Sequence, residues 1–395
     1  MGLPDIVIEF SKKAVTAIKN GTTGVVGLIV YESTREGVTI LNRVEDIPTG
    51  TSAFSEENTT FIRNAFLGAP SKVIVYAIRN KMNAVNDSAT PHYLNKAITF
   101  FSTQKVNYIA SNAFEVSAEI IDAHNNVIIA GVKSIRANTS CRPVAVVSSY
   151  GSLAMGDRSA VNFVVLYTDD SAGFDVTKDP TALYCLCANG EPVHTYAYTS
   201  RMAGLLAGLD LKVSATYKPL DEVTSIPVVT PERVNSAVDR GALVLYNNGE
   251  KIVIARGVNT LTTVNETETE DLKKIKISAI QDMIETDIYS TINNSYIGNY
   301  SNSYDNKCLL ITAIRGYLRG LEAVEGGKGY LKANSSNIEI NVAKQRQYLE
   351  SIGIDTSEMD EQAIKEANTG SHVFLKGTIS ILDAIEDVEI FINKE

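Results

Sequence analysis

The stretch Gly24-Val-Val-Gly-Leu-Ile-Val-Tyr31 decides the fold, because it carries no charged side chain along its whole length. A continuous apolar run of this kind is typical of a strand that helices cover on both faces of a parallel sheet. The pattern that follows predicts a helix over residues 54–67 and a second strand over residues 73–78. Residues 21–88 are therefore predicted to form a small α/β domain.

Further along the chain, helical and strand patterns continue to alternate. Helices are expected at residues 93–102, 114–137 and 199–208, and strands begin or lie at residues 108–109, 143–149, 162–167 and 182–187. The segment ALVLYNNGEKIVIA, residues 242–255, predicts a hairpin, because Asn247-Asn248-Gly249 between alternating strands suits positive φ. We expect residues 89–262 to form a second α/β domain around a mainly parallel sheet.

The last third of the chain predicts an α+β domain over residues 263–382. Isoleucine and leucine recur at helical spacing in residues 271–293 and 306–323, a Gly-rich loop follows, and a helix is expected at residues 361–367. Residues 373–381 alternate as a strand, an acidic link occupies residues 383–387, and residues 388–392 are expected to form a final strand. Residues 1–20 and 383–395 are interpreted as terminal arms, each with one short strand.

Composition limits the partners of the chain. Its 395 residues carry a net charge of −10, which argues against broad binding to nucleic acid, since phosphate recognition needs clustered cations. No stretch approaches the length of a membrane span, and the start MGLPDIVIEFSKK lacks a secretory pattern. The four cysteines have no zinc spacing, so core thiols are favoured. We expect a protein that is made and folded in the cytoplasm and does not insert into a membrane.

Motifs for catalysis are missing from the sequence. The four histidines form no HExxH pair, no GxSxG elbow occurs, and Gly326-Gly327-Lys328-Gly329 lacks the Ser/Thr and first glycine of a phosphate loop. Asp169 and Asp170 follow a predicted strand, where α/β enzymes keep catalytic groups, but adjacent acids there are also ordinary turn residues. We predict no catalytic residue, no cofactor and no metal, and we keep an α/β hydrolase as the alternative.

Several segments resemble the contractile tail sheath family, and they occur in the order of that family. They are GLPDIVIEF (2–10), the run at 24–31, RMAGLLAGLD (201–210) with ATYKP (215–219), IARGVNTLT (254–262), and the ending 373–392 with its DAIED link (383–387). The resemblance spans nearly the whole chain and is greatest to the short sheaths of PBSX-like prophages and diffocin-type bacteriocins. It implies a structural protein, not an enzyme.

The resemblance implies a subtilisin-like α/β middle domain without a protease site, an α+β C-terminal domain, and extended N- and C-terminal strand arms. It also implies a homo-oligomer of stacked rings around a tail tube, with baseplate and tail terminator proteins as further partners. Assembly would take place in the cytoplasm of the bacterial host, and contraction would drive the tube through the envelope of a target cell. Another self-assembling shell protein remains an alternative.

The terminal strands give a physical reason for polymerisation. A strand of five or six residues is not stable alone, and its free N–H and C=O groups pair with the sheet edge of another copy. Such a contact is heterologous, so it propagates instead of closing as a dimer. Carried over from the family, the expected donor strands are Ile6, Val7, Ile8, Glu9, Phe10 and Val388, Glu389, Ile390, Phe391, Ile392, and the receiving strand contains Val373, Leu375, Ile379 and Ile381.

The family also implies that the C-terminal domain faces the tube. Lys273, Lys274, Arg315 and Arg319 on the two amphipathic helices are candidates for contact with an acidic tube surface. The alternative is that they belong to the solvated faces of those helices.

Overall fold

The computed structural model of the chain describes residues 18, 24–85, 90–115, 117–149, 156–166, 184–188, 191–265 and 268–392. These residues divide into two compact units. The α/β unit runs from residue 24 to Thr286 and includes the chain again from Asp383, whereas the C-terminal unit is Asp287–Leu382 together with Ile18. The boundary between the two units falls within one helix, α6 (Ile275–Thr291).

A mainly parallel sheet forms the centre of the α/β unit. Among the described residues its order is β11-β10-β6-β5-β4-β1-β3-β2, and only the edge pairs β2–β3 and β10–β11 are antiparallel. The strands are β1 (Val25–Tyr31), β2 (Gly37–Leu41), β3 (Lys72–Ile78), β4 (Tyr108–Ser111), β5 (Val144–Val147), β6 (Ala160–Val164), β10 (Ala242–Asn247) and β11 (Ile252–Ile254).

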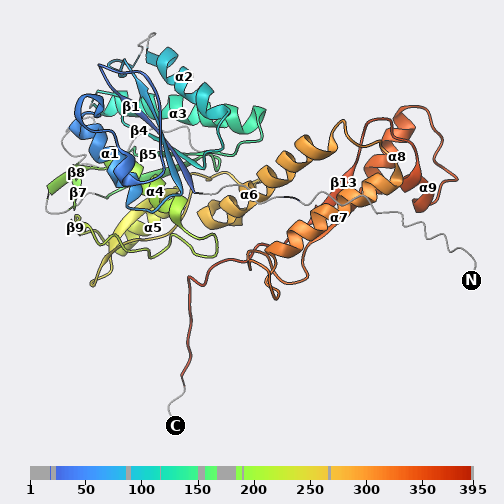
Figure 1. Ribbon diagram of the computed structural model, residues 1–395. Helices are drawn as coiled ribbons and strands as arrows, with labels where there is room; N and C mark the ends of the chain where they lie inside the picture. Colours follow the sequence, from blue (N-terminus) through green and yellow to red (C-terminus); the bar gives the residue numbers. More distant parts are fainter. Residues whose placement is uncertain are drawn as a thin grey trace, which may run out of the picture. The chain divides into compact units, whose positions relative to one another are not determined.

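Helices cover this sheet on both faces (Figure 1). Alternate residues of β1 point to opposite faces, so Val26 and Leu28 join the cluster that contains α1 (Glu56–Phe66) and α4 (Thr199–Gly208). Val25 and Ile29 join the other cluster, with α2 (Thr90–Ser102) and α3 (Ala118–Asn138). Each fully buried aliphatic side chain contributes about 1.5–3 kcal/mol. The apolar run at β1 is therefore explained by burial on both faces, as expected.

Two glycines allow α4 to lie directly against α1. A Cβ added to Gly204 would lie 1.9 Å from the carbonyl oxygen of Ala65, and one added to Gly208 would lie 1.7 Å from that of Gly68. These separations are far below van der Waals contact, so any side chain at either position would push the helices apart. The glycines of the RMAGLLAGLD segment are thus required by close packing.

Smaller elements complete the α/β unit. A sheet of order β8-β7-β9 contains β7 (Tyr184–Ala188), β8 (Glu191–His194) and β9 (Val223–Ser225). Helix α5 (Pro231–Asp239) begins with Pro231, whose fixed φ suits the first helical position. The hairpin of β10 and β11 forms as predicted, and Gly249 in its loop has φ of +94°.

The C-terminal unit is built from helices and a small antiparallel sheet. A π-helical segment, Ile292–Tyr296, follows α6, and then come α7 (Tyr304–Leu321), α8 (Val342–Ser351) and α9 (Glu361–Glu366). Strand β12 (Asn337–Ile340) pairs antiparallel with β13 (Leu375–Thr378). The α+β character expected for this part of the chain is present.

Several expected elements differ in extent from those observed. Lys273 ends a 3-10 turn and Lys274 precedes α6, so the helix expected from residue 271 begins later. Strands β2 and β12 and helix α8 were not expected, because each is short and half exposed and so lacks a clear apolar period. The domain boundary expected between residues 88 and 89 does not divide the sheet. Strands β1–β3, before this boundary, and strands β4–β6, after it, belong to the same sheet.

Candidate assembly surfaces

The C-terminal segment presents an exposed apolar surface. Val388, Ile390, Phe391 and Ile392 are 67%, 74%, 92% and 85% exposed, and Ile385 is 89% exposed. The structure assigns no strand to residues 388–392, and Figure 1 draws the segment after Leu382 without helix or strand. A strand at this position therefore requires a partner that the described part of a single chain does not supply.

The root of this segment is held to the α/β unit by one carboxylate. Glu386 Oε1 accepts hydrogen bonds from Ser214 Oγ at 2.8 Å and Thr216 Oγ1 at 2.7 Å. Its Oε2 lies 3.1 Å from Lys274 Nζ and 3.6 Å from Arg256 Nη1, and the Glu386 side chain is only 5% exposed. Burial alone would raise the pKa of Glu386, but the bonds from Thr216, Ser214 and Lys274 outweigh it and hold the pKa below its ordinary value.

Two further acids strengthen this attachment, which we call the arm clasp (Glu386, Asp383 and Asp387 with Lys274, Arg256, Ser214 and Thr216). Asp383 pairs with Lys274, and Asp387 pairs with Arg256. The acidic link predicted from the sequence is thus the segment that fixes the arm to its own α/β unit.

The basic residues predicted to face a tube differ in their surroundings. Lys274 belongs to the arm clasp, and Lys273 Nζ lies 2.7 Å from Glu270 Oε1. In the C-terminal unit, Arg315 Nη2 donates to the carbonyl oxygen of Ile338 at 2.8 Å. The side chain of Arg319 is exposed and makes no hydrogen bond or ion pair with the described residues. Arg319 is therefore the candidate with the greatest freedom to meet a partner.

The expected receiving strand is present over part of its length, as β13. The backbone N–H of Asn341 donates to the carbonyl oxygen of Phe374, and Lys376 opposes Glu339 in the same register. Because N–H and C=O groups alternate in direction along a strand, Leu375 and Gly377 direct theirs to the other edge. No third strand pairs with β13 at that edge among the described residues. The edge has the geometry of an acceptor for an added strand.

The expected N-terminal donor residues, Ile6 to Phe10, lie outside the described residues, and so do Asp169 and Asp170. Nothing in the structure tests either prediction.

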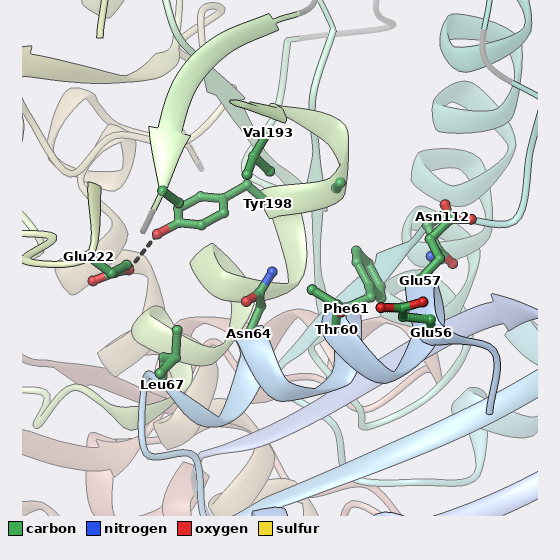
Figure 2. Close-up of a pocket in the computed structure, with 12 residues that line it drawn as sticks. Glu56, Glu57, Thr60, Phe61, Asn64, Leu67, Asn112, Val193, Tyr198 and Glu222 are labelled. Atoms are coloured by element: carbon green, nitrogen blue, oxygen red, sulfur yellow. Dashed lines mark hydrogen bonds between the residues drawn. The ribbon is translucent and has the colours of Figure 1, made fainter. Parts of the chain in front are cut away.

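A cavity of about 390 Å³ in the α/β unit is lined by α1 and by the segment around Tyr198 (Figure 2). The Tyr198 hydroxyl donates to Glu222, and Arg201 Nε donates to the same carboxylate at 2.6 Å. Burial alone would raise the pKa of Glu222, but the bonds from Arg201 and Tyr198 keep it below its ordinary value. The carboxylate is therefore a charged, satisfied hydrogen-bond acceptor that fixes the segments around it.

A second polar group lies at the carboxyl ends of the parallel strands. His124 is fully buried, its Nε2 lies 3.0 Å from Ser111 Oγ, and burial lowers its pKa to about 3. A neutral, enclosed imidazole packs as a core residue and has no access to a substrate from solvent. Within the described part of the chain, no group of three or more His, Cys, Asp or Glu side chains is arranged to hold a metal ion. None of the described helices combines the length and apolar character of a membrane span.

Comparison with known proteins identifies the class of this chain. Residues 267–393 match the family model of the phage tail sheath C-terminal domain. The tail sheath protein of Clostridium phage phiCD119 is 31% identical over 397 residues, which cover 98% of each chain. The chain belongs to the phage tail sheath protein family.

Solved structures share the fold. The sheath tail protein of Desulfitobacterium hafniense has a TM-score of 0.62 at 13% identity and covers 85% of this chain and 94% of its own. The sheath tail protein Lin1278 of Listeria innocua has a TM-score of 0.60 at 14% identity, and the match covers 93% of this chain and 97% of the Listeria chain. A chain from the anti-feeding prophage baseplate has a TM-score of 0.63 at 12% identity, and the match covers 100% of this chain and 99% of the baseplate chain.

The chain is accordingly a structural subunit of a tail sheath. The relatives named here are sheath and baseplate proteins, and they give no support to the α/β hydrolase or to another kind of shell.

Proposed function

We propose that this subunit polymerises by exchanging strands with its neighbours around a tail tube. The observation that carries the proposal is the exposed apolar segment 388–392, whose root is fixed by the arm clasp to its own α/β unit. A second copy offers the unpaired edge of β13. When the segment 388–392 of one copy pairs with the β13 edge of another, apolar side chains are buried. The unpaired backbone N–H and C=O groups of both strands also gain hydrogen-bond partners in place of water. Because donor and acceptor surfaces differ, the contact repeats from copy to copy.

The remaining features of the proposal follow the family. The N-terminal donor strand would be Ile6 to Phe10, and the residues toward the tube would be Lys273, Lys274, Arg315 and Arg319. Baseplate and tail terminator proteins would complete the assembly in the host cytoplasm, and the sheath would act without catalysis. The doubly covered parallel sheet is compatible with the subtilisin-like topology expected for the middle domain.

Contraction would use the same arms. The clasp and the added strand keep each subunit tied to its neighbours while the rigid α/β units exchange one set of contacts for another. The free energy that drives the tube would then be the difference between the extended and the contracted interfaces.

The test compares three truncated chains with the full chain by electron microscopy and by sedimentation. A chain that ends at Asp387 and a chain that begins at residue 12 should remain monomeric at concentrations at which the full chain forms cylinders. A chain that ends at Ile392 serves as the matched control and should polymerise normally. Normal cylinders from the chain that ends at Asp387 would overturn the C-terminal half of the proposal.

A further inference from the structure

A second cavity, within the C-terminal unit, has a volume of about 660 Å³. Its lining combines two tyrosines, Tyr296 and Tyr300, with Leu310 and Val373. Val373 is 40% exposed and precedes β13 by two residues, so the cavity adjoins one end of the proposed acceptor strand. Two polar residues, Lys307 and Asn302, also line it.

Lys307 is a buried cation without a counter-charge. Lys307 is 3% exposed, and its Nζ donates one long hydrogen bond of 3.4 Å to Thr369 Oγ1. An ammonium group has three donors, and no described carboxylate forms an ion pair with this one. Burial lowers the pKa of Lys307. The residue also lies near the start of α7, where the helix dipole is unfavourable to a positive charge.

Asn302, which also lines the cavity, is held in place by three hydrogen bonds. Its Nδ2 donates to the carbonyl oxygens of Gly370 at 2.8 Å and His372 at 2.9 Å, and to Thr369 Oγ1 at 3.1 Å. These bonds fix the orientation of the amide, and they leave Oδ1 buried without a hydrogen-bond partner. Buried polar atoms without a partner are uncommon in folded proteins. The cavity presents the Lys307 side chain between apolar walls, and this complements a peptide that carries a carboxylate.

The C-terminal segment supplies such a peptide. Three of its acids, Asp383, Glu386 and Asp387, are paired within the arm clasp. Glu389 makes no hydrogen bond or ion pair with the described residues, and exposed Val388 and Ile390 flank it. Glu389 is thus an unpaired acid on an exposed apolar segment, and Lys307 is a buried cation without an ion pair in the cavity that adjoins one end of β13.

We propose that this cavity receives Glu389 of a second copy of the chain, with its carboxylate paired to Lys307. The proposal rests on the strand exchange described above and adds the residue pair that sets its register. A short strand can slip by two residues and still keep the same face toward the core. One buried charge pair removes that ambiguity, because a slip by two residues brings to Lys307 either the apolar Phe391 or Asp387, which the arm clasp already pairs with Arg256.

The test is a double-mutant cycle with Lys307→Met and Glu389→Gln in the full chain. The measured quantities are the critical concentration for polymerisation and the thermal midpoint of the monomer. Each single variant should raise the critical concentration at least about tenfold, because it leaves one charged partner unpaired. The double variant should raise it no further than the worse single variant, since both changes remove one interaction.

The thermal midpoint of the monomer shows whether Lys307 serves binding between copies or the stability of its own chain. Lys307→Met should raise the thermal midpoint of the monomer, because it removes a buried charge and keeps an unbranched chain in place. A variant that folds more stably and assembles less readily is not explained by misfolding. Lys344→Met, at an exposed position on α8, is the matched control and should change neither quantity.

Two outcomes overturn the pairing. The first is wild-type polymerisation by both single variants, and the second is an additive effect in the double variant. If the chain that ends at Asp387 still fails to assemble in those cases, strand exchange stands and only the Lys307 pairing is wrong. If that truncated chain assembles normally, strand exchange itself is wrong.

Discussion

The glycines of α4 show how single residues determine the packing of the α/β unit. Gly204 and Gly208 are four residues apart on one helix face, and both meet backbone carbonyl groups of the α1 region. Such contacts cannot be relieved by rotating a side chain, because the obstructing atoms belong to the backbone.

We expect Gly204→Ala to destabilise the monomer by about 3 kcal/mol, since the added methyl overpacks a rigid helix contact. Gly316→Ala is the matched control, because Gly316 lies in α7 and a Cβ there has no neighbour within 4 Å. The control should stabilise the chain by about 0.5–1 kcal/mol through helix propensity alone. Urea unfolding of both variants measures the difference. Equal midpoints would show that the α1–α4 contact is not as close as described.

At the same scale, the sequence identifies the acids of the link but not their partners. Asp383 and Glu386 are recognisable as a charged turn, whereas Lys274 lies 109 positions before Asp383 in the chain. A tertiary ion pair over that separation leaves no periodic signal. For this reason the sequence suggests Lys274 only as a candidate for contact with a tube or as part of a solvated helix face, and it does not reveal the pair with Asp383. The same reason explains why Lys307 was not singled out.

At the scale of elements, a charge network fixes the first half of α6 to the α/β unit. Arg136 on α3 binds Asp282 through two parallel hydrogen bonds of 2.8 Å, and Arg158 Nη1 reaches the same carboxylate at 2.7 Å. Arg142 Nε donates to Glu285 at 2.8 Å. The side chains of Asp282, Arg136 and Arg158 are 9–11% exposed, so water screens these bonds weakly.

Asp282→Asn should lower the free energy of unfolding by about 3 kcal/mol, because it leaves two buried guanidinium groups without their shared counter-charge. A useful comparison is Glu361→Gln, which breaks a pair with Lys365 in which Glu361 is 76% exposed. That change should stay within about 0.5 kcal/mol. Denaturant titration checks both values, and a small effect of Asp282→Asn would mean that water reaches the network.

Elements with a long apolar pattern were predicted correctly, and short ones were not. Helix α4 begins and ends at the predicted residues, and β1, β3 and the β10–β11 hairpin lie within one or two residues of the prediction. Strand β12 was not expected, because its four residues bury only Ile340. Tertiary pairing with β13, not local preference, makes that segment a strand.

At the scale of the whole molecule, the sequence predicted the mixed α/β fold class. The order of apolar strands and helices indicated a covered parallel sheet, and that sheet is observed. The expected division at residue 88 marks no break, because parallel strands from both sides of it pair side by side. The sequence alone could not show how the arm is attached to the α/β unit, since that depends on tertiary contacts.

The arm clasp makes the attachment of the C-terminal arm dependent on pH. The pKa of Glu386 in the folded chain is below its ordinary value of 4.5, so its carboxylate stabilises the clasp fully above that pH. This contribution is lost as the pH falls through 4.5 and the lower folded-state pKa, because protonation removes the ion pair with Lys274. A fluorophore attached to the C-terminus of the monomer should therefore show decreasing anisotropy over this range.

Glu386→Gln should release the arm already at neutral pH and abolish the pH dependence, with a loss of about 2 kcal/mol for the charged hydrogen bonds. Asp387→Asn is the matched control, because Asp387 is 77% exposed and its pair with Arg256 is screened by water. The control should keep both the neutral-pH anisotropy and its decrease in acid. If Glu386→Gln kept high anisotropy, contacts other than this carboxylate would hold the arm. The coupling between arm and α/β unit that we propose for contraction would then lie elsewhere in the chain.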